Sequence, residues 1–282
     1  REKNVTVIPF VNSLGHNTLF PRMIPEISAK DADGKPTGYG YCLTSPKTRE
    51  FLKTFYTGIV ERCFPDGADF FHIQLDEVYP THADSENPTR KVDPWCQCPE
   101  CSKTTPQERL LDYVLWLVTM LTENGVNKVV MWNDQLTRHM DLLDSEFVER
   151  LEERGLRERL ILHWWWYNNR ELHEKVHPEK AVNAGIESWI APMTCYFNWS
   201  RYDVRLPNIE HMMTMGLEEG ATGAVSYSIH DPAWADHEHV LAQYAWNGAE
   251  IDSLREARER WARHRFPELP VDELLDAVDA LA

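Results

Sequence analysis

Two adjacent carboxylates, Asp76 and Glu77, come directly after the apolar stretch at residues 70–75. The stretch is typical of a β-strand, in which neighbouring side chains point to opposite faces. A bend at the strand's end would bring both acids into one pocket, where different surroundings separate their pKa values. One acid can then stay ionised while the other holds a proton, as acid-catalysed cleavage of a glycosidic bond requires. The alternative is a pair of solvated loop acids.

Other polar and aromatic side chains also follow predicted strands. Strands are expected at residues 5–11, 69–75, 128–132, 160–166, 188–193 and 223–228. The residues at or just after their ends are His16, Asn133 and Asp134, the aromatic residues 164–167, Tyr196, and His230 and Asp231. The carboxyl-end loops of a parallel sheet are where (β/α)8 barrels build their active sites. We therefore expect these side chains to lie at one end of the sheet.

Helical periodicity separates most of these strands. Helices are expected at residues 46–63, 107–124, 145–154, 171–176, 209–216, 237–246 and 253–264. Strands that alternate with helices predict an α/β fold with a parallel sheet. The six strands are two fewer than a closed (β/α)8 barrel contains. No glycine-rich phosphate loop follows a strand, which argues against nucleotide chemistry.

The composition narrows the class of partner. The net charge of −16 disfavours nucleic acids and anionic membranes. No run of about 18 apolar residues predicts a membrane span, and no signal peptide is recognisable, which favours the cytoplasm. Eleven tryptophans are available to stack on sugar rings, although several are expected to serve only in the core.

Two motifs resemble glycoside hydrolase family 20, the β-N-acetylhexosaminidases. Residues 9–16, PFVNSLGH, resemble the family's pattern P-E-x-D-x-P-G-H, with Pro9, Gly15 and His16 in place. Residues 72–77, HIQLDE, resemble H-x-G-G-D-E, with its two glycines replaced. Weaker matches are Trp132, Tyr196 and Trp234, which fall where the family has a Trp, a Tyr and a Trp. The resemblance covers roughly residues 5–240.

The resemblance implies a substrate-assisted mechanism. Glu77 would be the general acid and later the base, and Asp76 would orient the substrate's 2-acetamido nitrogen. The acetamido oxygen, hydrogen-bonded by Tyr196, would attack the anomeric carbon, so no enzyme carboxylate is the nucleophile. The remaining substrate-binding candidates are His16, His72, Trp132, Asp134, Trp164, Trp166, Asp231 and Trp234. No cofactor is expected for catalysis.

The resemblance also implies a domain organisation. The chain would begin at the third strand of a TIM-type barrel, so that the first two strands would lie upstream. Residues 1–250 would form the catalytic barrel with strands three to eight, and residues 251–282 a C-terminal helical segment. The expected partner is a carbohydrate, an N-acetylhexosaminide. The expected reaction is cleavage of either terminal or internal β-linked sugars.

Three of the six cysteines form a C-x-C-x-x-C motif: Cys96, Cys98 and Cys101. Zinc prefers four ligands in structural sites, and Cys42 is the expected fourth, with His82 as the alternative. A disulfide or free thiols are the competing interpretations. Cys63 and Cys195 are expected to be buried residues without a role. A zinc ion here would brace the site and take no part in its chemistry.

Two other functions remain open. A two-carboxylate glycosidase would pair Glu77 with Asp134 or Asp231 and act on sugars without an acetamido group. A non-catalytic carbohydrate-binding barrel is the other alternative, because the two glycines before Asp76 are replaced.

Overall fold

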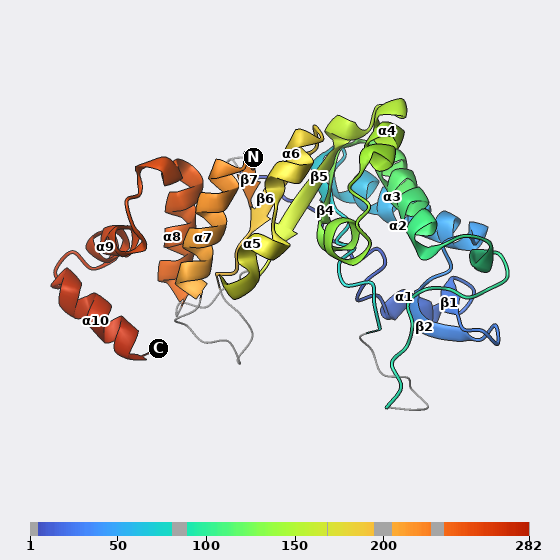
Figure 1. The fold of residues 1–282 in the computed structure, drawn as a ribbon, viewed down its shortest axis with the longest axis horizontal. Coiled ribbons are helices and arrows are strands. Elements are labelled where there is room, and N and C mark those ends of the chain that lie inside the picture. The colour runs from blue at the N-terminus through green and yellow to red at the C-terminus, as the bar shows by residue number, and fades with distance from the viewer. Residues whose placement is uncertain (1–4, 81–88, 168, 195–204, 227–233, 282) are drawn as a thin grey trace. The chain divides into compact units, whose positions relative to one another are not determined.

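A computed structural model describes residues 5–80, 89–167, 169–194, 205–226 and 234–281 (Figure 1). The chain divides into two compact units, Arg1–Leu162 and His163–Ala282, and the division falls within strand β5 (Leu160–Trp165). The two units are described separately below. Along the larger sheet, the strands follow one another in the order in which they occur along the chain.

The first unit contains a hairpin and a β–α–β unit. Helix α1 (Leu19–Met23) precedes the antiparallel hairpin of β1 (Ser28–Lys30) and β2 (Pro36–Tyr41). After helix α2 (Pro46–Cys63), strand β3 (Ala68–His72) pairs in parallel with β4 (Val126–Trp132), and helix α3 (Pro106–Glu123) connects them. A π-helix (Gln135–His139) and α4 (Ser145–Glu153) follow β4.

Helix α3 shows how local sequence sets these elements. Thr105 and Glu108 form a reciprocal capping box at its start, and Pro106 occupies the first turn. Its inner face is fully buried, with Leu110, Val114 and Leu117 at 0% exposure. Burial of such an apolar stripe is the main source of helix stability in a globular protein. The helix thereby fixes the crossover between β3 and β4, whose ends carry the acids.

The second unit continues the alternation of strands and helices. Its elements are α5 (Leu172–Lys175), α6 (Pro178–Asn183), β6 (Glu187–Ala191), α7 (Arg205–Glu218), β7 (Gly223–Ala224), α8 (Ala235–Asn247), α9 (Leu254–Arg265) and α10 (Val271–Leu281). Strands β6 and β7 are parallel, and α7 and α8 lie side by side (Figure 1). Helices α9 and α10 pack through a small cluster around Trp261 and Leu275.

The prediction of an α/β fold with a parallel sheet is confirmed. The predicted strand at residues 5–11 is wrong: only Phe10 forms a bridge, with His72. Two backbone hydrogen bonds hold it, Val11 N to His72 O and His72 N to Pro9 O, while Val5 and Val7 are exposed. The hairpin β1–β2 was not predicted, because its glycines and Asp33 indicated only a loop. Among the helices of the described ranges, none is long and apolar enough to cross a membrane.

Candidate active site

The backbone between β3 and the acids is unusual. Strand β3 ends at His72, three residues earlier than predicted, and Gln74, Leu75 and Glu77 have positive φ angles of 54°, 70° and 50°. Left-handed backbone costs a non-glycine residue about 1–2 kcal/mol and is concentrated at functional sites. The amide of Gln74 donates to His72 Nδ1 at 2.9 Å, which stabilises the turn.

Neighbouring elements hold this turn in place. Ile73 and Leu75 are fully buried and anchor it in the core. The amide of Glu77 donates to Asp134 Oδ2 at 2.9 Å, and the amide of Val78 donates to Gln135 Oε1 at 3.2 Å. Side chains at the start of the π-helix after β4 therefore accept the backbone hydrogen bonds of the turn. These hydrogen bonds restrict the backbone that carries Asp76 and Glu77.

His16 joins the two carboxylates. Its Nε2 atom lies 2.8 Å from Glu77 Oε2 and 3.4 Å from Asp76 Oδ2. The preceding residue is Gly15, where a Cβ atom would lie 1.6 Å from the carbonyl oxygen of Asp76. Only glycine permits this approach of the two loops. The close approach explains why glycine precedes the histidine, and it brings the imidazole onto both acids.

The three groups change one another's proton affinity. Hydrogen bonds with Asp76 and Glu77 raise the pKa of His16 to about 10. The hydrogen bond from His16 lowers the pKa of Glu77, whereas burial raises the pKa of Asp76. At neutral pH the shared proton therefore resides on the imidazole, and Asp76 is the carboxylate whose charged form burial disfavours.

One oxygen of the site has no donor among the residues that the structure describes. Asp76 Oδ1 is buried and makes no hydrogen bond with the residues that the structure describes. A buried acceptor without a donor costs about 1–3 kcal/mol. The other oxygen of the same carboxylate faces His16. A ligand N–H or O–H that reached this buried oxygen, beside Glu77, would satisfy it.

Asp134 lies behind the acids. Its side chain is fully buried, and Oδ2 accepts the Glu77 amide and lies 3.4 Å from His139 Nε2. His72 and Trp132 are also buried, and their rings pack against each other at 4.8 Å with Phe10 alongside. These three predicted site residues support the turn from within, and half-exposed Phe10 packs on His72 and Trp132.

Sequence reasoning missed three residues of the site. The Tyr79 side chain hydrogen-bonds Glu77 and lowers the carboxyl pKa of Glu77. Burial, together with this hydrogen bond, raises the pKa of Tyr79. The ring of Tyr79 lies 5.3 Å from that of His139. Gln135 holds the turn through Val78. The only available signal was the position of Tyr79, two residues after Glu77.

The remaining predicted residues belong to the second unit. Trp164 is fully buried and its indole donates to Ser188 Oγ at 3.2 Å, which favours a packing role. Trp166 directly follows β5 and is half-buried, with Lys175 Nζ 5.9 Å from its ring. Trp234 precedes α8 and packs on His237. Tyr196 and Asp231 lie outside the described residues.

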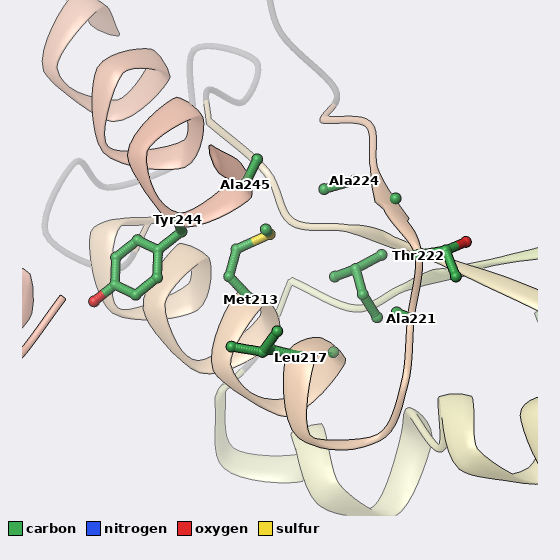
Figure 2. A pocket seen from close by; sticks show the side chains of 10 residues that line it. Met213, Leu217, Ala221, Thr222, Ala224, Tyr244 and Ala245 are labelled. Atoms are coloured by element: carbon green, nitrogen blue, oxygen red, sulfur yellow. The ribbon is translucent and has the colours of Figure 1, made fainter. Parts of the chain in front are cut away.

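The second unit also contains a pocket of about 100 Å³ between β6, β7, α7 and α8. Figure 2 shows Met213, Leu217 and Ala245 among its side chains, with Tyr244 beside them. None of the described residues that line it is a carboxylate or a tryptophan. Its described lining therefore offers no carboxylate for acid catalysis.

The four predicted metal ligands gather in the first unit. The sulfur atoms of Cys42, Cys96, Cys98 and Cys101 all lie within 4.8 Å of one another. His82, the alternative ligand, and Cys195 lie outside the described residues. The expectation that Cys63 is buried is wrong, because it ends α2 on the surface.

Comparison with known proteins finds one family. The model of the glycosyl hydrolase family 20 catalytic domain matches residues 1–250. A search of curated proteins finds no match.

Proposed function

The chain belongs to glycosyl hydrolase family 20, and from that premise we propose that it cleaves β-linked N-acetylhexosamine, terminal or internal, with retention of configuration. The substrate's acetamido oxygen is the nucleophile, and Glu77 is the acid and then the base. Asp76 orients the acetamido nitrogen. Tyr196, outside the described residues, is the proposed donor to the acetamido oxygen.

The observation that carries the proposal is the donorless oxygen of Asp76. Oδ1 is buried and without a donor among the described residues, while Oδ2 faces His16. An acetamido N–H is a neutral donor that would satisfy this acceptor without adding charge. An ionised Asp76 would in turn polarise the amide, so that its oxygen becomes a better nucleophile for the anomeric carbon.

The proton for the leaving group comes from the His16–Glu77 pair. In the free site the imidazole holds this proton, 2.8 Å from Glu77 Oε2. A sugar that excludes water weakens the charged pair and favours transfer of the proton to the carboxylate, which yields two neutral groups. Glu77 then protonates the glycosidic oxygen and later accepts a proton from the attacking water.

The two-carboxylate alternative has less support. A nucleophile and an acid must flank the scissile bond, about 5 Å or more apart. Asp134 is fully buried, and its Oδ2 is engaged by the Glu77 amide, so it is not free to attack a sugar. Asp231, the other candidate, lies outside the described residues.

Replacement of Glu77 by glutamine tests the acid role. Hydrolysis of substrates with poor leaving groups should fall by about 10² or more, the usual contribution of general acid catalysis. Activated aryl glycosides should be affected much less, because their leaving groups need little protonation. Steady-state kinetics with both substrate types measures the difference, and Glu61→Gln on the exposed face of α2 is the control.

A thiazoline that mimics the cyclised intermediate tests the nucleophile. It should inhibit strongly, because a site complementary to the intermediate binds its analogue more tightly than substrate.

Full activity of Glu77→Gln on an unactivated substrate would contradict the acid role. A trapped glycosyl-enzyme or an inverted product would favour the two-carboxylate mechanism, and sugar binding without turnover would favour the non-catalytic alternative.

A further inference from the structure

Four thiols from two distant parts of the first unit meet at one point. Cys42 directly follows β2, whereas Cys96, Cys98 and Cys101 lie in the segment that leads to α3. Cys42 Sγ lies 3.7 Å from Cys98 Sγ and 3.9 Å from Cys101 Sγ. Three of the four residues are buried and Cys98 is half-buried, and all four are free of disulfides.

These distances match a metal site better than a disulfide or a thiol cluster. A tetrahedral zinc ion with Zn–S bonds of about 2.3 Å places its sulfurs about 3.8 Å apart. A disulfide needs an S–S distance of about 2.05 Å. Every pair of the four sulfurs lies within 4.8 Å, so the spacing does not select one pair of cysteines for a disulfide. We propose that Cys42, Cys96, Cys98 and Cys101 bind one structural zinc ion.

The surroundings of the sulfurs suit thiolates. The amide of Lys30 donates to Cys96 Sγ at 3.3 Å, and the amide of Cys101 donates to Cys98 Sγ at 3.5 Å. The hydroxyl of Thr44 lies 3.2 Å from Cys101 Sγ. Donors of this kind stabilise negative sulfur and orient the ligands of a metal. They come from the hairpin, its following loop and the cysteine segment itself.

The metal would fasten the hairpin β1–β2 to the cysteine segment. The two are already in close contact, since the amide of Gln97 donates to the Lys30 carbonyl at 2.7 Å. At Gly40, whose φ is +69°, a Cβ atom would lie 2.4 Å from the Pro94 carbonyl oxygen. Only a residue without a side chain permits this approach, so the hairpin is shaped to fit the segment.

The same hairpin contacts both loops of the acid site. The amide of Gly40 donates to the carbonyl of Asn17, the residue after His16, at 3.1 Å. The hydroxyl of Tyr39 donates to the carbonyl of Tyr79, two residues after Glu77, at 3.3 Å. The zinc ion therefore positions His16 and Glu77 through β2 and touches neither, which is a structural role.

Metal analysis of the purified chain tests the site. Protein prepared with zinc should contain about one zinc ion per chain. Exchange for Co²⁺ should give the intense thiolate-to-metal charge-transfer bands of a tetrahedral site with sulfur ligands. The thiols of the cluster should resist alkylation until a strong chelator is added, whereas exposed Cys63 should react at once.

Three variants locate the metal. Cys98→Ser removes the most accessible ligand and should abolish or strongly reduce zinc content, while Cys63→Ser, outside the cluster, should retain it. His16, Asp76 and Glu77 are the other group of possible metal ligands among the described residues. Glu77→Gln should also retain zinc, because the proposed zinc ligands are the four cysteines. If Cys98→Ser fails to fold, the Co²⁺ spectrum of the unaltered chain decides between sulfur and oxygen ligands.

Three results would overturn the proposal. One is zinc content far below one per chain with all six cysteines reactive in the folded protein. Another is a disulfide among the four residues under reducing conditions. The third is zinc that persists in Cys98→Ser and disappears in Glu77→Gln, which would assign the metal to the acid site.

Discussion

The acid cluster (His16, Asp76 and Glu77) and the cysteine cluster (Cys42, Cys96, Cys98 and Cys101) satisfy the same spacing, with ligating atoms within 4.8 Å of one another. They differ in almost every other respect. The side chains of the acid cluster are partly exposed, from 17% for Asp76 to 37% for His16. Two of its residues, His16 and Glu77, have left-handed backbone. Three of the cysteines are buried.

The difference indicates two ways to use a group of ligating side chains. In the acid cluster, one buried oxygen has no donor among the described residues, and three groups share a proton, so a substrate can change the interactions of the cluster. In the cysteine cluster, backbone and hydroxyl donors surround the sulfurs. Close spacing alone therefore does not identify a metal site; burial, charge and unsatisfied atoms distinguish it from a reactive one.

Chelation should separate the two clusters most strongly. Structural zinc binding contributes on the order of 10 kcal/mol in small metal domains. A strong chelator should therefore increase hydrogen exchange at residues 91–105 and in the hairpin β1–β2. Strands β3 and β4, paired in the core, should keep their protection. Equal loosening of both regions, or of neither, would contradict the difference between the clusters.

The pH dependence of stability should reveal the acid cluster. Because the pKa of His16 is raised from 6.5 to about 10, the folded state binds its proton more tightly than the unfolded chain does. This contribution is fully present below pH 6.5 and is lost as pH rises through about 10.

Urea unfolding of the unaltered chain and of His16→Gln from pH 6 to pH 10 measures this effect. The stability advantage of the unaltered chain should decrease with increasing pH, and exposed His211→Gln controls for loss of a surface imidazole. An advantage that grows with pH would show that the imidazole is neutral in the folded protein.

The smallest effect concerns the strained backbone before the acids. Gln74→Gly should raise the free energy of unfolding by about 0.5–1 kcal/mol, since relief of the left-handed conformation exceeds the entropic cost of glycine. Activity should persist, because glycine occupies this position in the family's motif. Asp141→Gly, at a φ of 50° outside the acid turn, is the matched control for thermal unfolding. If Gln74→Gly destabilises the protein and Asp141→Gly does not, the side chain of Gln74 is required for stability.

The sequence was sufficient for the elements with strong local signals. Helix α2 has the predicted bounds, and α3 begins within one residue of its predicted start, because both helices have a clear apolar periodicity. The hairpin β1–β2 was missed because its pairing depends on contacts with the distant cysteine segment. The end of β3 was predicted three residues too late, because the left-handed turn sets it and the replacement of two glycines had concealed that turn.

The candidate site was only partly predictable for a related reason. Asp76, Glu77 and His16 could be named from adjacency and motif, and the structure brings these three together. The support from Gln135, His139 and Tyr79 depends on how the π-helix packs against the acid turn. No periodicity in the sequence encodes that packing.

Paired substrates that differ only at carbon 2 test the central claim most directly. Asp76→Asn should reduce kcat/KM strongly for a 2-acetamido aryl glycoside, because an amide in place of the carboxylate polarises the acetamido group poorly. The matched 2-hydroxyl glycoside should be hydrolysed slowly, and equally so, by both proteins. An equal loss on both substrates, or efficient cleavage of the 2-hydroxyl glycoside by the unaltered chain, would contradict a mechanism in which Asp76 acts through the acetamido group.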